Sequence, residues 1–215
     1  MKNKKYILFD LDGTLTDSKE GIFRCFLHAF DTLGIPRPDD ETMRSFLGPP
    51  LTESFKRVIG DDERAAEGVR IYRERYSTVG LFENHPYEGI KELLEALRGR
   101  GYVLAVATSK PEPFSRRILE RFGLIGYFDT VTGCGLDGSL DTKAEVIAET
   151  LRRLGVEDKS EAVMVGDRKH DILGAREAGL ECIGAGWGFA EPGELEENGA
   201  CCIAQTVKEL EDIFA

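Results

Sequence analysis

Carboxylates, hydroxyls and lysines gather in a few short segments of this chain, and together such groups can bind phosphate and a hard metal ion. Magnesium prefers oxygen ligands and keeps several waters, so two or three protein oxygens suffice. A carboxylate can also attack phosphorus, while a second carboxyl protonates the leaving group and later activates water. The segments contain Asp10, Asp12, Gly13 and Thr14; Thr108, Ser109 and Lys110; Lys143; and Asp167 and Asp171.

The predicted strands would bring these segments to one place. Residues 5–11, 102–107 and 162–165 form apolar runs that predict buried strands, and a polar segment follows each one. Predicted helices at 89–100, 112–122, 143–154 and 171–178 alternate with strands that also include 128–133 and a last one at 182–185. Such alternation predicts an α/β fold with a doubly wound, Rossmann-like, mostly parallel sheet. Ligands of such sheets bind outside the carboxyl ends of the strands.

A helical block interrupts this alternation directly after the first strand. Apolar residues recur at helical spacing between Ile22 and Leu33, and further helices are predicted at 42–47, 52–59 and 61–77. We therefore expect residues 1–17 and 86–215 to form a catalytic core and residues 18–85 a small all-helical cap domain. The apolar loop 46–51, FLGPPL, is expected to lie over the active site.

Composition excludes several classes of protein. The chain has 215 residues, of which 41% are hydrophobic and 31% charged, as in globular proteins. A net charge of −11 argues against a nucleic-acid polymer as partner. The longest apolar runs are too short to cross a bilayer, and the five cysteines show no C-x-x-C spacing. We therefore expect a cytoplasmic protein with free thiols, no membrane partner and a small phosphorylated metabolite as substrate.

Four segments, taken in order, resemble the motifs of the haloacid dehalogenase-like (HAD) superfamily. Residues 9–15, FDLDGTL, resemble its first motif, and Thr108 and Lys143 resemble the second and third. Gly166-Asp167, followed by Asp171, resembles the fourth. The resemblance covers essentially the whole chain and is greatest to the phosphoglycolate-phosphatase-like branch with a helical cap. Taken alone, each of these residues also fits an ordinary turn, a helix cap or an exposed site. For all four motifs to be structural only, four independent coincidences would be needed, so the combination favours the family.

The resemblance implies a role for each motif residue. Asp10 would be the nucleophile that forms an aspartyl-phosphate, and Asp12 the general acid and base. Thr108 and Lys143 would hold the phosphoryl oxygens. Magnesium would be bound by Asp10, by the main-chain carbonyl of Asp12 and by Asp167, with Asp171 acting through water or a hydrogen bond. Contacts with substrate are expected from Gly13, Thr14, Ser109 and Lys110.

The sequence leaves the substrate and the reaction open. We expect a magnesium-dependent phosphatase of small phosphate monoesters, with a slight preference for phosphoglycolate, whose carboxylate Lys110 could bind. Arg168 stands where phosphoglycolate phosphatases often carry a small residue. Together with Lys169, His170 and the 46–51 loop, it favours a nucleoside 5′-monophosphate phosphatase as the alternative. A sugar phosphomutase of the same superfamily would use the same two aspartates, and among non-enzymes a receiver-like phospho-aspartate signalling module would use similar groups. The oligomeric state is not legible in the sequence.

Overall fold

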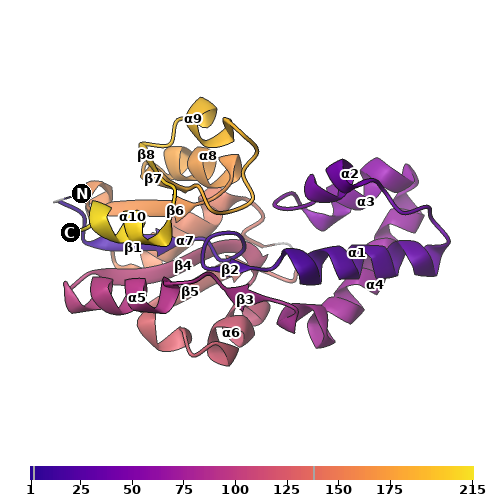
Figure 1. Cartoon of the computed structure of the whole chain (residues 1–215), viewed down its shortest axis with the longest axis horizontal. Coiled ribbons are helices and arrows are strands. Elements are labelled where there is room, and N and C mark those ends of the chain that lie inside the picture. The colour runs from indigo at the N-terminus through magenta and orange to yellow at the C-terminus, as the bar shows by residue number, and fades with distance from the viewer. Residues whose placement is uncertain (2, 138) are drawn as a thin grey trace. The chain divides into compact units, whose positions relative to one another are not determined.

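The chain folds into two compact units, as the computed structural model in Figure 1 shows. The structure describes residues 1, 3–137 and 139–215. One unit comprises Met1–Asp17 and Pro86–Ala215, and the other comprises Ser18–His85. Two short strands, β2 (Thr16–Asp17) and β3 (His85–Pro86), pair where the chain passes from one unit to the other. Within the described residues, no helix combines the length and the apolar character that a membrane span requires.

A six-stranded sheet forms the centre of the first unit. Its strands follow the order β5-β4-β1-β6-β7-β8, and every neighbouring pair is parallel. In the central strand, Leu8 lies opposite Ala105 on one side and Met164 on the other. The strands are β1 (Tyr6–Phe9), β4 (Val103–Pro111), β5 (Thr130–Cys134), β6 (Ala162–Gly166), β7 (Glu181–Ala185) and β8 (Cys202–Ala204). The predicted α/β fold with a parallel sheet is confirmed.

Both faces of this sheet are covered, which explains why its strands read as continuous apolar runs. On one face Leu8, Ala105 and Met164 pack with residues of two helices, α7 (Lys143–Leu154) and α8 (Lys169–Ala178). On the other face Ile7, Val106 and Val163 are also completely buried. The helices of this unit are α5 (Ile90–Gly99), α6 (Glu112–Arg121), α7 (Lys143–Leu154), α8 (Lys169–Ala178), α9 (Glu194–Asn198) and α10 (Val207–Ile213), with single 3₁₀ turns η2 (Ile125–Tyr127) and η3 (Lys159–Glu161).

The structure corrects the sequence-based elements at three points. The strand at 182–185 is not the last one, because β8 follows it as an edge strand, and the short helix α9 between the two was missed. Both are too short, at three and five residues, for a periodic pattern to reveal them. Strand β4 extends to Pro111, beyond the predicted end at 107, and its pairing with β5 shifts register between Thr108 and Pro111.

The second unit is all-helical and has an aromatic core of its own. Phe26 packs against Phe46, Phe55 and Tyr72 with ring centroids 4.5–4.9 Å apart. Phe46 is therefore a core residue of this unit, and its side chain is not offered to a substrate, contrary to what the apolar 46–51 loop suggested. The helices are α1 (Lys19–Leu33), α2 (Asp40–Arg44), α3 (Leu51–Ile59) and α4 (Asp62–Thr78), followed by the 3₁₀ turn η1 (Gly80–Phe82). Its role as a cap over the active site stays a prediction.

Candidate active site

The carboxyl ends of three neighbouring strands carry the predicted site residues. Asp10 directly follows β1, Thr108 lies in β4 and Asp167 directly follows β6. Two helices that follow strands of the same sheet add Lys143, the first residue of α7, and Asp171, in the first turn of α8. Because parallel strands end at a common edge, residues far apart in the sequence meet there.

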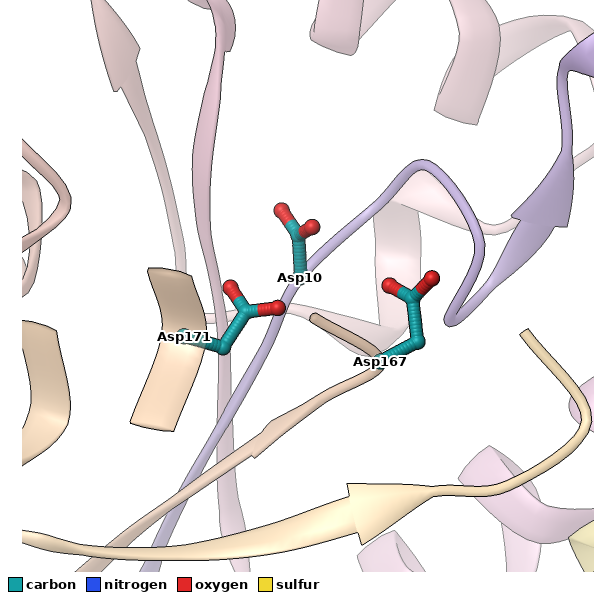
Figure 2. Close-up of side chains that lie close together, drawn as sticks. All are labelled: Asp10, Asp167 and Asp171. Carbon is teal, nitrogen blue, oxygen red and sulfur yellow. The ribbon is translucent and has the colours of Figure 1, made fainter. Parts of the chain in front are cut away.

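Three buried carboxylates form the centre of the site. Asp10, Asp167 and Asp171 are 8%, 0% and 2% exposed, and each offers a ligand oxygen within 4.8 Å of the others. Figure 2 shows the three side chains projecting to the same side from three different segments. Burial raises the pKa of the Asp167 carboxyl well above its usual range, and the nearby charges of Asp171 and Asp10 raise it further. Positive charge is therefore needed nearby to keep all three carboxylates ionised.

Lys143 supplies one positive charge to this cluster. Its Nζ donates to Asp10 Oδ1 and lies 2.8 Å from both Asp10 Oδ1 and Asp171 Oδ1. A third contact, of 3.2 Å, goes to the carbonyl of Ala107 at the end of the neighbouring strand. Burial alone would lower the pKa of Lys143, but the Asp10 and Asp171 carboxylates outweigh it and raise that pKa. The ammonium is therefore charged at neutral pH.

Both oxygens of Asp167 accept hydrogen bonds. Oδ1 accepts from the Thr14 hydroxyl at 3.1 Å, and Oδ2 accepts from the main-chain N–H of Phe189 at 2.8 Å. Gly13 has φ +85°, and a Cβ there would lie 2.1 Å from Asp167 Oδ2, so only glycine fits. The sequence assigned Gly13 and Thr14 to the substrate. The structure places both against Asp167, with Thr14 completely buried, and their contact with substrate stays a prediction.

Lys110 and Asp12 form a second charged pair at the same edge. Lys110 Nζ lies 2.7 Å from Asp12 Oδ2, and the lysine side chain is only 7% exposed. The other oxygen, Asp12 Oδ1, is buried and has no hydrogen-bond partner among the described residues. The Thr108 hydroxyl accepts from the main-chain N–H of Lys110 at 3.3 Å, whereas Ser109 is exposed. Lys110 thus contacts the predicted acid and base, a contact that the sequence did not suggest.

The donor set fits a hard divalent cation. Carboxylate oxygens of Asp10 and Asp167, with the main-chain carbonyl of Asp12, are ligands that Mg²⁺ prefers. Their mutual proximity and burial give the cluster excess negative charge that Lys143 alone does not neutralise. Asp171 contacts Lys143 through Oδ1 and accepts from the N–H of Arg168 at 3.0 Å through Oδ2. A bound Mg²⁺ would neutralise phosphoryl oxygens as charge develops.

Sequence reasoning missed the segment that follows β7. Trp187 Nε1 donates to the carbonyl of Thr14 at 3.1 Å, and Phe189 donates to Asp167. Arg168, which in the sequence favoured the nucleotide alternative, pairs with Glu194, with Nε and Oε1 2.9 Å apart. One signal was available for this segment, since it follows the predicted strand at 182–185 and so lies at the same sheet edge.

The chain is similar over most of its length to known proteins of one family. The family model described as haloacid dehalogenase-like hydrolase matches residues 7–185. A 5′-nucleotidase of Pseudomonas aeruginosa is 48% identical over 193 residues, which are 89% of this chain and 87% of that protein. The tyrosine-protein kinase PtkA of Mycobacterium tuberculosis (strain H37Rv) is 39% identical over 98% of this chain and 72% of its own length.

Two further proteins are similar to most of the chain. A phosphoglycolate phosphatase of Aquifex aeolicus is 33% identical over 87% of each chain. The crystal structure of a predicted phosphatase from Clostridium acetobutylicum superposes with a TM-score of 0.92 at 42% identity, over 98% of each chain. The names of the three relatives differ in substrate but share the handling of a phosphoryl group.

Proposed function

Because the chain belongs to the haloacid dehalogenase-like hydrolase family, we propose that it is a magnesium-dependent phosphatase that acts through an aspartyl-phosphate on Asp10. The family assigned from the motifs is confirmed, and the chain is a phosphoric monoester hydrolase. The metal, the intermediate and the substrate belong to the proposal. The observation that carries it is the contact of Lys143 with both Asp10 and Asp171, beside the buried carboxylate of Asp167.

The residues of this site suit a two-step displacement. In the first step an Asp10 oxygen forms a bond to phosphorus while the bond from phosphorus to the ester oxygen breaks, and Asp12 gives its proton to the departing alcohol. In the second step water attacks phosphorus, Asp12 takes the water proton, and the Asp10 carboxylate is released with inorganic phosphate. Thr108 and Lys143 would bind phosphoryl oxygens, and Lys143 also neutralises the nucleophile before attack.

Nucleoside 5′-monophosphates are our first candidate substrates. The 48% identity to the Pseudomonas aeruginosa 5′-nucleotidase exceeds the 33% identity to the phosphoglycolate phosphatase. The structure engages the cation named for each substrate, because Lys110 pairs with Asp12 and Arg168 pairs with Glu194, so the comparison of identities carries the choice. Phosphoglycolate stays the alternative substrate, since relatives with that name match most of the chain.

A phosphate-release assay with Mg²⁺ tests this proposal. We expect kcat/KM to be at least tenfold higher for a nucleoside 5′-monophosphate than for phosphoglycolate, and no release in EDTA. The reverse ratio would establish phosphoglycolate as the better substrate and overturn the nucleotide proposal. Turnover that requires a sugar bisphosphate would indicate the phosphomutase instead. A receiver-like module would give at most one phosphate per chain.

Trapping the intermediate separates the mechanism from the substrate. A substrate labelled with ³²P should leave acid-stable, hydroxylamine-labile label on the wild-type chain after rapid quenching. The Asp10→Asn variant should carry none. Label that survives this substitution would place the phosphoryl group on another residue.

A further inference from the structure

A ring of hydrogen bonds and one ion pair begins and ends at Asp167 and includes residues outside all four motifs. From Asp167 the chain continues to Arg168, whose Nε lies 2.9 Å from Glu194 Oε1. Glu194 Oε2 accepts from the main-chain N–H of Glu191 at 3.1 Å. The loop of residues 187–191 then returns to Asp167 through the N–H of Phe189, at 2.8 Å from Oδ2.

Glu194 makes more of these contacts than any other residue of the ring. Its carboxylate accepts from Arg168 Nε, from the N–H of Lys169 at 2.7 Å and from the N–H of Glu191. The ion pair is largely buried, with side-chain exposures of 12% for Arg168 and 9% for Glu194. One carboxylate therefore joins the first residues of α8 to the 187–191 loop. Removing Arg168 would leave the largely buried Glu194 carboxylate without this opposite charge, which is unfavourable.

The 187–191 loop fits closely against Asp167 and the first motif. A Cβ on Gly188 would lie 2.3 Å from Asp167 Cβ and 2.4 Å from the carbonyl of Gly13. Trp187 Nε1 donates to the carbonyl of Thr14, the residue whose hydroxyl binds the other oxygen of Asp167. The loop thus fixes Asp167 both directly and through Thr14. Displacing it would free the carboxylate to rotate.

We propose that the Arg168–Glu194 ion pair is a positioning element that sets the affinity for Mg²⁺, by holding the 187–191 loop against Asp167. This inference rests on the magnesium site proposed above. Groups that orient metal ligands commonly change metal affinity by about 10–100-fold when they are lost. The ion pair acts less directly, through Glu191 and then through the N–H of Phe189, so we expect a loss of affinity of about fivefold to tenfold.

Thermal unfolding of the chelator-treated protein, titrated with MgCl₂ at constant ionic strength, measures that affinity without turnover. For Arg168→Met and for the milder Glu194→Gln we expect the half-maximal Mg²⁺ concentration to rise about fivefold or more. The same shift should appear in phosphate release, with most of kcat recovered at high Mg²⁺. Arg168→Lys, which keeps the charge, should give a smaller shift than Arg168→Met.

Arg100→Met is the matched control. It removes a more exposed ion pair of the same unit, in which Arg100 Nη2 lies 2.8 Å from Glu211 Oε1. This variant should melt close to wild type, because exposed ion pairs contribute little to stability, and it should keep the wild-type Mg²⁺ midpoint. Equal midpoints for Arg168→Met, Glu194→Gln and wild type would overturn the inference, as would an equal shift in the control. If wild type itself neither responds to Mg²⁺ nor releases phosphate, the proposed function fails, and the inference fails with it.

Discussion

Replacing Asp167 with asparagine is expected to stabilise the protein in the absence of metal while abolishing its response to Mg²⁺. The side chain is completely buried beside two other carboxylates, so its charge is a cost to folding until a cation binds. Asparagine can keep both hydrogen bonds. Its carbonyl oxygen can accept from Phe189, and the Thr14 hydroxyl can rotate to accept from the amide.

The magnitude follows from the separation of the charges. Two unit charges 4.8 Å apart repel by about 3.5 kcal/mol at an effective dielectric constant near 20. Lys143 offsets part of this repulsion, because it contacts Asp10 and Asp171. We therefore expect Asp167→Asn to increase the free energy of unfolding by about 1–3 kcal/mol at pH 8 in EDTA. For a chain of this size that raises the melting temperature by about 2–12 °C.

The pH dependence has a definite sign. The pKa of Asp167 is higher in the folded state than in the unfolded state, where it is near 4. At a pH between these two pKa values, the folded protein binds more protons than the unfolded chain. The stability of metal-free wild type should therefore fall as pH rises through that interval, and this loss should be smaller in Asp167→Asn. Mg²⁺ at a thousand times the dissociation constant should reverse the order, because wild type then gains about 4.1 kcal/mol.

Melting curves between pH 4 and 9, in EDTA and in MgCl₂, check this prediction. Glu157→Gln, an exposed site, is the control for removing one negative charge from a chain of net charge −11. If metal-free Asp167→Asn melts below wild type at pH 8, the cluster is not a source of strain and the reasoning is wrong.

Three further substitutions have expected outcomes. Asp10→Asn should keep the fold and slow phosphate release at least about a thousandfold, or roughly 4 kcal/mol of barrier, and near-normal turnover would refute the mechanism. Lys143→Met should cost about 3–5 kcal/mol of metal-free stability, measured by urea unfolding, because it leaves buried carboxylates unpaired. Lys110→Met should slow phosphate release from an alkyl phosphate at least about tenfold more than from p-nitrophenyl phosphate, because Lys110 contacts Asp12 and the nitrophenolate leaving group needs little proton donation from Asp12. A selective rise in the KM for phosphoglycolate would instead support a contact between Lys110 and the substrate carboxylate.

The sequence by itself determined the α/β class and the sheet edge at which Asp10, Thr108, Lys143 and Asp167 meet. Apolar runs of strand length, each followed by a polar segment, contain that information locally, and parallel strands must end at one edge. The four motif segments also identified the family, because their order and spacing are visible in the linear chain.

Only the tertiary structure decided which atoms contact each other at that edge. Thr14 and Asp167 are 153 residues apart, and Arg168 and Glu194 are 26 apart. Lys110 could have faced a substrate, yet it pairs with Asp12. Local patterns reveal periodicity and turns, whereas these pairings depend on strand register and on how loops from different strands pack. A short irregular segment such as 187–191 has no period to detect, so its contact with Asp167 appears only once the sheet has assembled.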